Sequence, residues 1–132
     1  MVNLLLDHGA DPNVRCESIH ETPLISGIMN ESSEAVTALI ERGADTNLAT
    51  LRDGTTPLHS AAMRGHVAIF TALLNRGADP HKRKTGSYRS TTRQSAIELA
   101  VHIGASDIIR VLFEAGHDPN VCTGSNLMFV LI

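Results

Sequence analysis

The sequence predicts an all-α solenoid of short paired antiparallel helices joined by hairpin-like loops, and three repeating features predict it. A Gly-x-Asp turn recurs at spacings of 34, 34 and 39 residues, and a helix-start triplet and a leucine keep the same register. Periods of roughly 20–50 residues are typical of proteins in which each unit buries its apolar face against its neighbours. The turns are Gly9-Ala10-Asp11, Gly43-Ala44-Asp45, Gly77-Ala78-Asp79 and Gly116-His117-Asp118; the triplets are Thr22-Pro23-Leu24, Thr56-Pro57-Leu58 and Ser95-Ala96-Ile97; the leucines are Leu5, Leu39, Leu73 and Leu112.

Within the unit at 45–78, the order of residues predicts two short helices. Thr56 is a good N-cap, and Pro57 suits the first helical position because its missing N–H has no partner there. Gly65 is placed to end this helix in the left-handed conformation, and His66 opens the second helix. The apolar positions follow helical spacing in both segments. They are Leu58, Ala61 and Ala62 in the first helix and Val67, Phe70, Leu73 and Leu74 in the second.

These residues resemble the ankyrin repeat family, whose unit has a TPLH-x-A helix start, a Gly-His between helices and a GAD-x-N turn. The segment from Thr56 to His66 matches that pattern almost throughout, and the resemblance covers nearly the whole chain. It implies a single array over 1–132, possessing a partial unit at 1–10, full units at 11–44, 45–78 and 79–117, and the start of a further unit at 118–132. Because both ends fall inside a unit, we expect a piece of a longer array or a truncated product.

Two units depart from the pattern. The unit at 11–44 lacks the motif histidine, the alanine pair and the inter-helix glycine, so we expect it to be the weakest of the array. The replacements, in that order, are Ile25, Gly27 with Ile28, and Glu31. In the unit at 79–117, Ser95 replaces the capping threonine and Gly104 keeps the helix stop, so the unit stays recognisable.

Composition excludes several classes of function. Aromatic residues make up 3% of the chain and the net charge is −3, which disfavours a base-stacking nucleic-acid platform. Neither end carries an apolar segment near the ~20 residues that a membrane span needs. Cys16 and Cys122 stand alone, so we expect neither a disulfide framework nor a metal site, and we expect the reducing interior of the cell, cytoplasm or nucleus. The seven histidines form no ligand or catalytic pattern, and no cofactor motif is present.

The resemblance implies a non-enzymatic module that binds another protein through a concave face, built from loop tips and exposed positions of the first helices. Carried over position by position, the expected contact residues are Ser26, Met29, Asn30, Leu51, Arg52, Ser60, Met63, Arg64, Glu98, His102 and Ile103. An alternative is that the chain is the regulatory ankyrin segment of a larger enzyme or transport protein. A third expectation concerns the two ends, which look uncapped and would allow self-association.

The feature most particular to this chain is an insertion over 81–94, which lengthens one loop by five residues. It carries five of the eleven basic residues and no acid, so the rest of the chain is acidic. We expect it to project from the body and to offer cations to an acidic partner, a phosphate-bearing surface or an import receptor; the alternative is a solvated loop without a partner. Its candidate contact residues are Lys82, Arg83, Lys84, Tyr88, Arg89 and Arg93.

Overall fold

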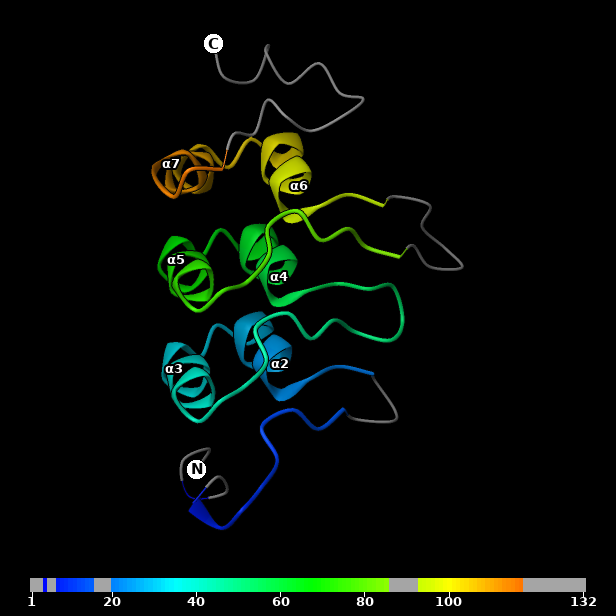
Figure 1. Ribbon diagram of the computed structural model, residues 1–132, viewed down its shortest axis with the longest axis vertical. Coiled ribbons are helices and arrows are strands. Elements are labelled where there is room, and N and C mark those ends of the chain that lie inside the picture. The colour runs from blue at the N-terminus through cyan, green and yellow to red at the C-terminus, as the bar shows by residue number, and fades with distance from the viewer. Residues whose placement is uncertain (1–3, 5–6, 16–19, 86–92, 118–132) are drawn as a thin grey trace.

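The computed structural model describes residues 4, 7–15, 20–85 and 93–117 (Figure 1). Six helices have complete bounds within these residues, and no strand is formed there beyond an isolated antiparallel bridge between Arg83 and Ser95. The helices are α2 (Pro23–Met29), α3 (Ser33–Glu41), α4 (Pro57–Arg64), α5 (Val67–Asn75), α6 (Ala96–Ile103) and α7 (Ser106–Glu114). The predicted all-helical class is confirmed.

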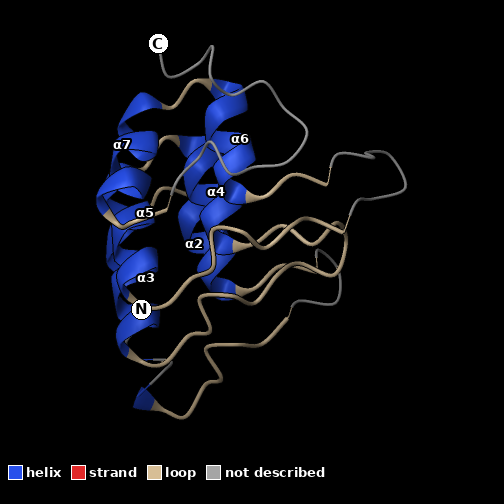
Figure 2. Ribbon diagram, turned by 45° about the horizontal axis from the view of Figure 1, so that its top comes forward, coloured by secondary structure: helices blue, strands red, loops and turns tan. Residues whose placement is uncertain are grey.

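The helices form two layers. The first helices α2, α4 and α6 stack in one layer and the second helices α3, α5 and α7 in the other, while the long loops all extend away on the first-helix side (Figures 1 and 2). Each first helix packs against its own second helix, and α4 also packs against both α2 and α6. Each of the expected units at 11–44, 45–78 and 79–117 thus contains one helix pair.

Each first helix begins at a hydroxyl cap. The side chains of Thr22, Thr56 and Ser95 accept hydrogen bonds from the backbone N–H three residues on. Such a cap satisfies an N–H that has no partner inside the helix. Gly65 and Gly104 end α4 and α6 in the left-handed region, with φ of 68° and 71°. The helix limits around α4 therefore agree with those predicted from the sequence.

The core is aliphatic and continuous across the units. Ala61 and Ala62 of α4 are fully buried, and their small side chains allow α4 to lie close to the helices on both sides. Phe70 of α5 is the largest fully buried side chain. Other core residues with at most 1% exposure are Leu24, Ile28, Leu58, Leu73, Ala96, Ile97, Ala100, Ile108 and Leu112. Because these residues come from all three helix pairs, each unit depends on its neighbours for burial.

Side-chain hydrogen bonds connect successive loops. The Oδ1 atom of Asn47 accepts from the backbone N–H of Asp79 at 2.7 Å, and its Nδ2 donates to the carbonyl oxygen of Gly77 at 3.0 Å. Asn13 accepts from the N–H of Asp45 in the same way, at 2.6 Å. These bonds hold neighbouring loops in register, which places the loop tips beside the first helices.

Candidate functional site

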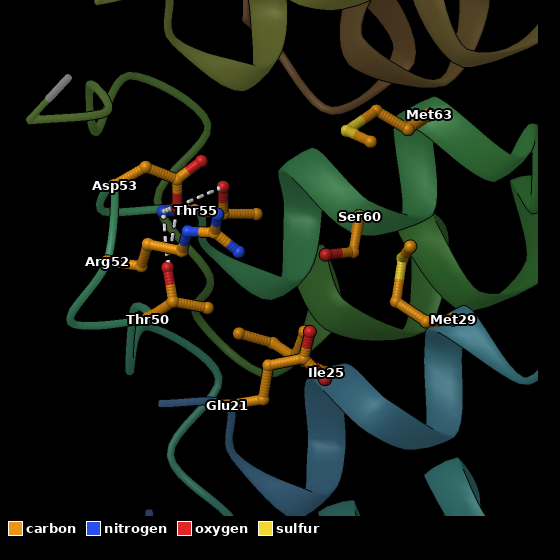
Figure 3. A pocket seen from close by; sticks show the side chains of 9 residues that line it. All are labelled: Glu21, Ile25, Met29, Thr50, Arg52, Asp53, Thr55, Ser60 and Met63. Atoms are coloured by element: carbon orange, nitrogen blue, oxygen red, sulfur yellow. Dashed lines mark hydrogen bonds between the residues drawn. The ribbon is translucent and has the colours of Figure 1, made fainter. Parts of the chain in front are cut away.

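A groove of about 280 Å³ lies between the loop at 50–55 and the first helices α2 and α4 (Figure 3). We call it the loop–helix groove. Its residues come from two neighbouring units, so it exists only because the units stack. The groove is lined by Glu21, Ile25, Met29, Thr50, Arg52, Asp53, Thr55, Ser60 and Met63.

The helix side of the groove is apolar except for Ser60. Met29 of α2 and Met63 of α4 lie one unit apart, and Met63 is 49% exposed (Figure 3). Ile25 is 2% exposed and belongs to the floor. Leu51, an expected contact residue, is 61% exposed but is not among the residues that line the groove. Thioether side chains adapt their shape readily, so this side suits an apolar group of variable outline.

The loop side is built around Asp53. Its Oδ1 accepts hydrogen bonds from the Thr50 hydroxyl at 2.7 Å, the Thr55 hydroxyl at 2.8 Å and the Thr55 backbone N–H at 3.1 Å. Burial alone would raise the pKa of Asp53, but these hydrogen bonds and nearby Lys84 hold the pKa below its usual value. Asp53 is therefore ionised at neutral pH and stiffens the loop that carries Arg52.

Two further charged groups face the groove. The Oε2 atom of Glu21 accepts a hydrogen bond from the Ser26 hydroxyl at 3.1 Å. Arg52 is exposed, forms no ion pair with the described residues, and extends from the loop into the groove toward Ser60 (Figure 3). The groove thus combines an apolar wall with a cation that is open to a partner.

The structure brings together four of the residues expected from the sequence, namely Met29, Arg52, Ser60 and Met63. Asn30, Arg64, His102 and Ile103 are exposed at the C-terminal ends of the first helices. Tyr88 and Arg89 lie outside the described residues. The sequence reasoning missed Glu21, Ile25, Thr50, Asp53 and Thr55. Only their closeness in sequence to the caps Thr22 and Thr56 could have indicated them.

Two expected contact residues are buried, which corrects the prediction that they are exposed. Ser60 is 1% exposed because α4 packs between two helices, although it still lines the groove. Glu98 is 8% exposed and completes a capping box with Ser95, in which each side chain accepts the other's backbone N–H. The Glu98 carboxylate also pairs with Arg83 at 2.5 Å. Glu98 therefore has a structural role, in capping α6 and pairing with Arg83.

The described parts of the insertion, 81–85 and 93–94, contact the neighbouring loop and α6, while residues 86–92 of the loop that is expected to project lie outside the described residues. Lys82 donates to the carbonyl oxygen of Asn47 at 2.8 Å, Arg83 pairs with buried Glu98, and Lys84 lies 3.9 Å from Asp53. The backbone N–H of Thr85 also donates to the Asp53 carbonyl oxygen at 3.0 Å. The side chains of Lys82, Arg83 and Lys84 thus contact groups of the neighbouring loop and of α6.

His59 has a structural role. Its Nδ1 accepts from the backbone N–H of Thr56 at 3.1 Å, and its Nε2 donates to the carbonyl oxygen of Gln94 at 2.8 Å. Burial lowers the pKa of His59 to about 4, because water cannot stabilise the charged ring. Among the described residues, no group of three or more His, Cys, Asp and Glu side chains is arranged to hold a metal ion, and no helix is long and apolar enough to cross a membrane.

A second groove, of about 400 Å³, opens beside α2 and α3 on the side facing the N-terminus. Most of its lining is apolar, including Pro12, Val14, Gly27, Ala35 and Leu39. The stacking pattern explains its position, because α2 packs against α4 on one side and turns the opposite side toward this groove.

Comparison with known proteins agrees with this architecture. The chain matches the family described as ankyrin repeats (3 copies) over residues 1–84 and again over residues 51–123. No curated protein matches the chain. The family match spans most of the sequence and coincides with the three stacked helix pairs and their capped first helices. The chain therefore belongs to the ankyrin repeat family.

Proposed function

We propose that the protein binds a partner protein through the loop–helix groove and has no catalytic activity of its own. Ankyrin repeats are in general protein–protein interaction modules. The observation that carries the proposal is the convergence of Met29, Arg52 and Met63 from two stacked units on a single groove. An exposed apolar wall beside an open cation provides the mixture of burial and charge that protein interfaces use.

Site-specific photo-crosslinking tests this proposal. A benzophenone amino acid replaces Met63 in the groove or, as a control, Phe113, which is 48% exposed on α7 in the second-helix layer. In cell extract we expect a partner to crosslink to the groove position and not to the control position. Equal crosslinking at both positions, or crosslinking at position 113 alone, would contradict the proposal.

The regulatory alternative uses the same groove. If the chain is a segment of a larger enzyme or transport protein, the partner is another domain of that protein, and the same crosslink would form within one polypeptide. The size of the crosslinked product separates the two cases. Binding of an anionic partner through the insertion has less support, because the side chains of Lys82, Arg83 and Lys84 contact groups of the chain itself.

We also propose that copies of the chain associate with one another through the ends of the array. The apolar groove beside α2 and α3 supports it, since an apolar end surface favours burial against another molecule. Sedimentation velocity over a range of concentrations tests it. We expect a dimer whose population rises with protein concentration. Val14 is 54% exposed at the groove, and replacing it by Asp, with the buried Leu39 unchanged, should weaken the dimer. A monomer at all concentrations would contradict it.

A further inference from the structure

We infer that the loop–helix groove takes an acidic peptide segment of the partner, with a carboxylate at Arg52 and a large apolar side chain against Met29 and Met63. This inference rests on the proposed function and names the chemistry of the partner. It follows from which groups in the groove already have partners and which are open.

The two carboxylates of the groove differ in how far internal contacts satisfy them. Asp53 accepts three hydrogen bonds from Thr50 and Thr55 and lies 3.9 Å from the Lys84 ammonium, and Glu21 accepts one from Ser26. A basic side chain of a partner would have to compete with these internal donors. Asp53 therefore offers little to a basic side chain. Glu21 and Arg52 both lack an ion pair among the described residues, but Glu21 is half-buried whereas Arg52 is exposed.

Arg52 is in the opposite situation to Asp53. Its guanidinium reaches into the groove and has no ion-pair partner among the described residues. A planar guanidinium carries five donors in a fixed arrangement that matches the two oxygens of a carboxylate. Such charge-assisted bidentate bonds are among the strongest polar contacts in proteins. The open polar group of the groove thus selects an acid.

The loops around the groove carry charges of both signs. Exposed Arg15, Lys82 and Arg93 belong to the loops on the same side of the molecule. The acids Asp11, Asp45 and Asp79 stand where these loops begin, and each accepts a backbone N–H two residues on. These acids stay charged when they accept a backbone N–H, so they offset the three cations, and the preference for an acid rests on Arg52 itself.

The apolar wall supplies the second half of the recognition. Met29 and Met63 border about 280 Å³ of space. This volume suits one large side chain, such as leucine, methionine or phenylalanine. Burial of that side chain supplies most of the affinity, while the pair with Arg52 sets orientation and specificity.

A nucleic acid or an anionic membrane fits the groove less well than a peptide. A phosphate polymer needs several open cations and usually aromatic surfaces for stacking. The lining residues include no aromatic side chain and a single cation, Arg52. A single cation beside apolar side chains matches a peptide that carries one carboxylate and one apolar residue.

A selection experiment tests the inference with the full chain and a phage-displayed library of random dodecapeptides. We expect the enriched peptides to carry Asp or Glu within a few residues of Leu, Met or Phe. Affinity of the enriched peptide is then measured by fluorescence anisotropy for Arg52→Glu and for the control Arg110→Glu. Arg110 lies on α7, and its side chain is 72% exposed, so the control makes the same charge change in the second-helix layer.

We expect Arg52→Glu to weaken peptide binding by roughly tenfold or more, because an attraction in a partly enclosed groove becomes a repulsion. Arg110→Glu leaves the affinity unchanged. Replacing the acid of the peptide by Lys restores binding to Arg52→Glu, and this rescue also shows that the variant is folded.

Other outcomes overturn the inference. If binding depends on Met63, as judged by Met63→Glu, but neither an acid in the peptide nor Arg52 matters, the acidic chemistry is wrong while the groove still binds protein. If the enriched peptides are insensitive to Met63→Glu as well, the proposed function itself fails. A single-stranded oligonucleotide and phosphatidylserine vesicles are tested as well. If either binds as tightly as the peptide and the binding depends on Arg52, the ligand of the groove is a polyanion and not an acidic peptide.

Discussion

The Nε2 atom of His59 donates a hydrogen bond to the carbonyl oxygen of Gln94, 2.8 Å away and 35 residues along the chain. The same ring accepts the backbone N–H of Thr56 at Nδ1. Since a backbone N–H only donates and a carbonyl only accepts, the ring is held neutral with its proton on Nε2. One histidine thus caps α4 and connects it to the loop before α6.

This arrangement makes stability depend on pH. The unfolded chain binds a proton at His59 near pH 6.5, whereas the folded chain binds it only near pH 4. The unfolded state therefore holds more protons in this window, and the free energy of unfolding falls as pH falls from about 6.5 to 4, by about 3 kcal/mol. Urea unfolding at several pH values measures this change.

The matched control for His59 is His59→Gln, which keeps an acceptor for the capping box and does not titrate. We expect the free energy of unfolding of the variant to change much less between pH 6.5 and 4. The change that remains comes from other titrating groups, which both proteins share. An equal slope in the two proteins would show that His59 is not the titrating group.

Replacing Glu31 by Gly is expected to stabilise the protein. Glu31 has φ of 58°, at the position where the next units have Gly65 and Gly104. A non-glycine residue in the left-handed region costs about 1 kcal/mol. The contact of Glu31 with Arg64, at 3.9 Å on the surface, contributes little. We expect Glu31→Gly to raise the free energy of unfolding by about 1 kcal/mol.

Gly65→Ala provides the reverse change. Its φ is 68°, and a methyl group there would meet no atom within 4 Å, so only the backbone conformation is tested. We expect a loss of about 1 kcal/mol, measured by the same chemical denaturation. If both variants shift stability in the same direction, the left-handed conformation of Glu31 is not the cause.

Asn47 is expected to couple two units. Its amide accepts the N–H of Asp79 and donates to the carbonyl oxygen of Gly77. Loss of both bonds in Asn47→Ala should cost about 1–2 kcal/mol and increase hydrogen exchange of the Asp79 amide. Asn75→Ala, at the exposed end of α5, is the control and should change neither quantity. Unchanged exchange at Asp79 in Asn47→Ala would contradict the coupling.

The ion pair of Arg83 with Glu98 predicts a non-additive pair of variants. Glu98 is buried, so Arg83→Ala leaves a carboxylate without its cation and should cost about 2 kcal/mol. In a Glu98→Gln background, which retains the capping box, the same change should cost much less. Arg93→Ala, at an exposed position of the insertion, is the control. Equal costs of Arg83→Ala in both backgrounds would show that the pair contributes nothing.

The repeats and helix limits could be predicted because they follow from local rules. Thr56 accepts a backbone N–H three residues on, and Gly65 takes a left-handed φ, so both mark helix ends within a few residues of sequence. The spacing of Leu58, Ala61 and Leu73 likewise shows which faces are buried. These signals repeat in every unit, and the repetition identifies the stack.

The groove was only partly predictable. Met29, Arg52 and Met63 follow from their positions in the repeat, whereas Asp53, Thr50 and Glu21 obey no repeat pattern. The expected exposure of Ser60 was wrong because α4 is enclosed by its neighbours, which no count within one unit reveals. The paired state of Lys84 was equally hidden, since its partner Asp53 belongs to another loop.

The sequence by itself determined the fold, because caps, turns and apolar periods act over a few residues and recur at a fixed spacing. Only the tertiary structure decided which charged side chains have an ion-pair partner within the chain and which do not. Asp53 and Glu98 have cations from the insertion beside them, Lys84 and Arg83, whereas Arg52 has no ion-pair partner among the described residues. Electrostatic pairing acts through space between loops that stacking brings together, so the availability of a charge to a partner is a property of the assembled array.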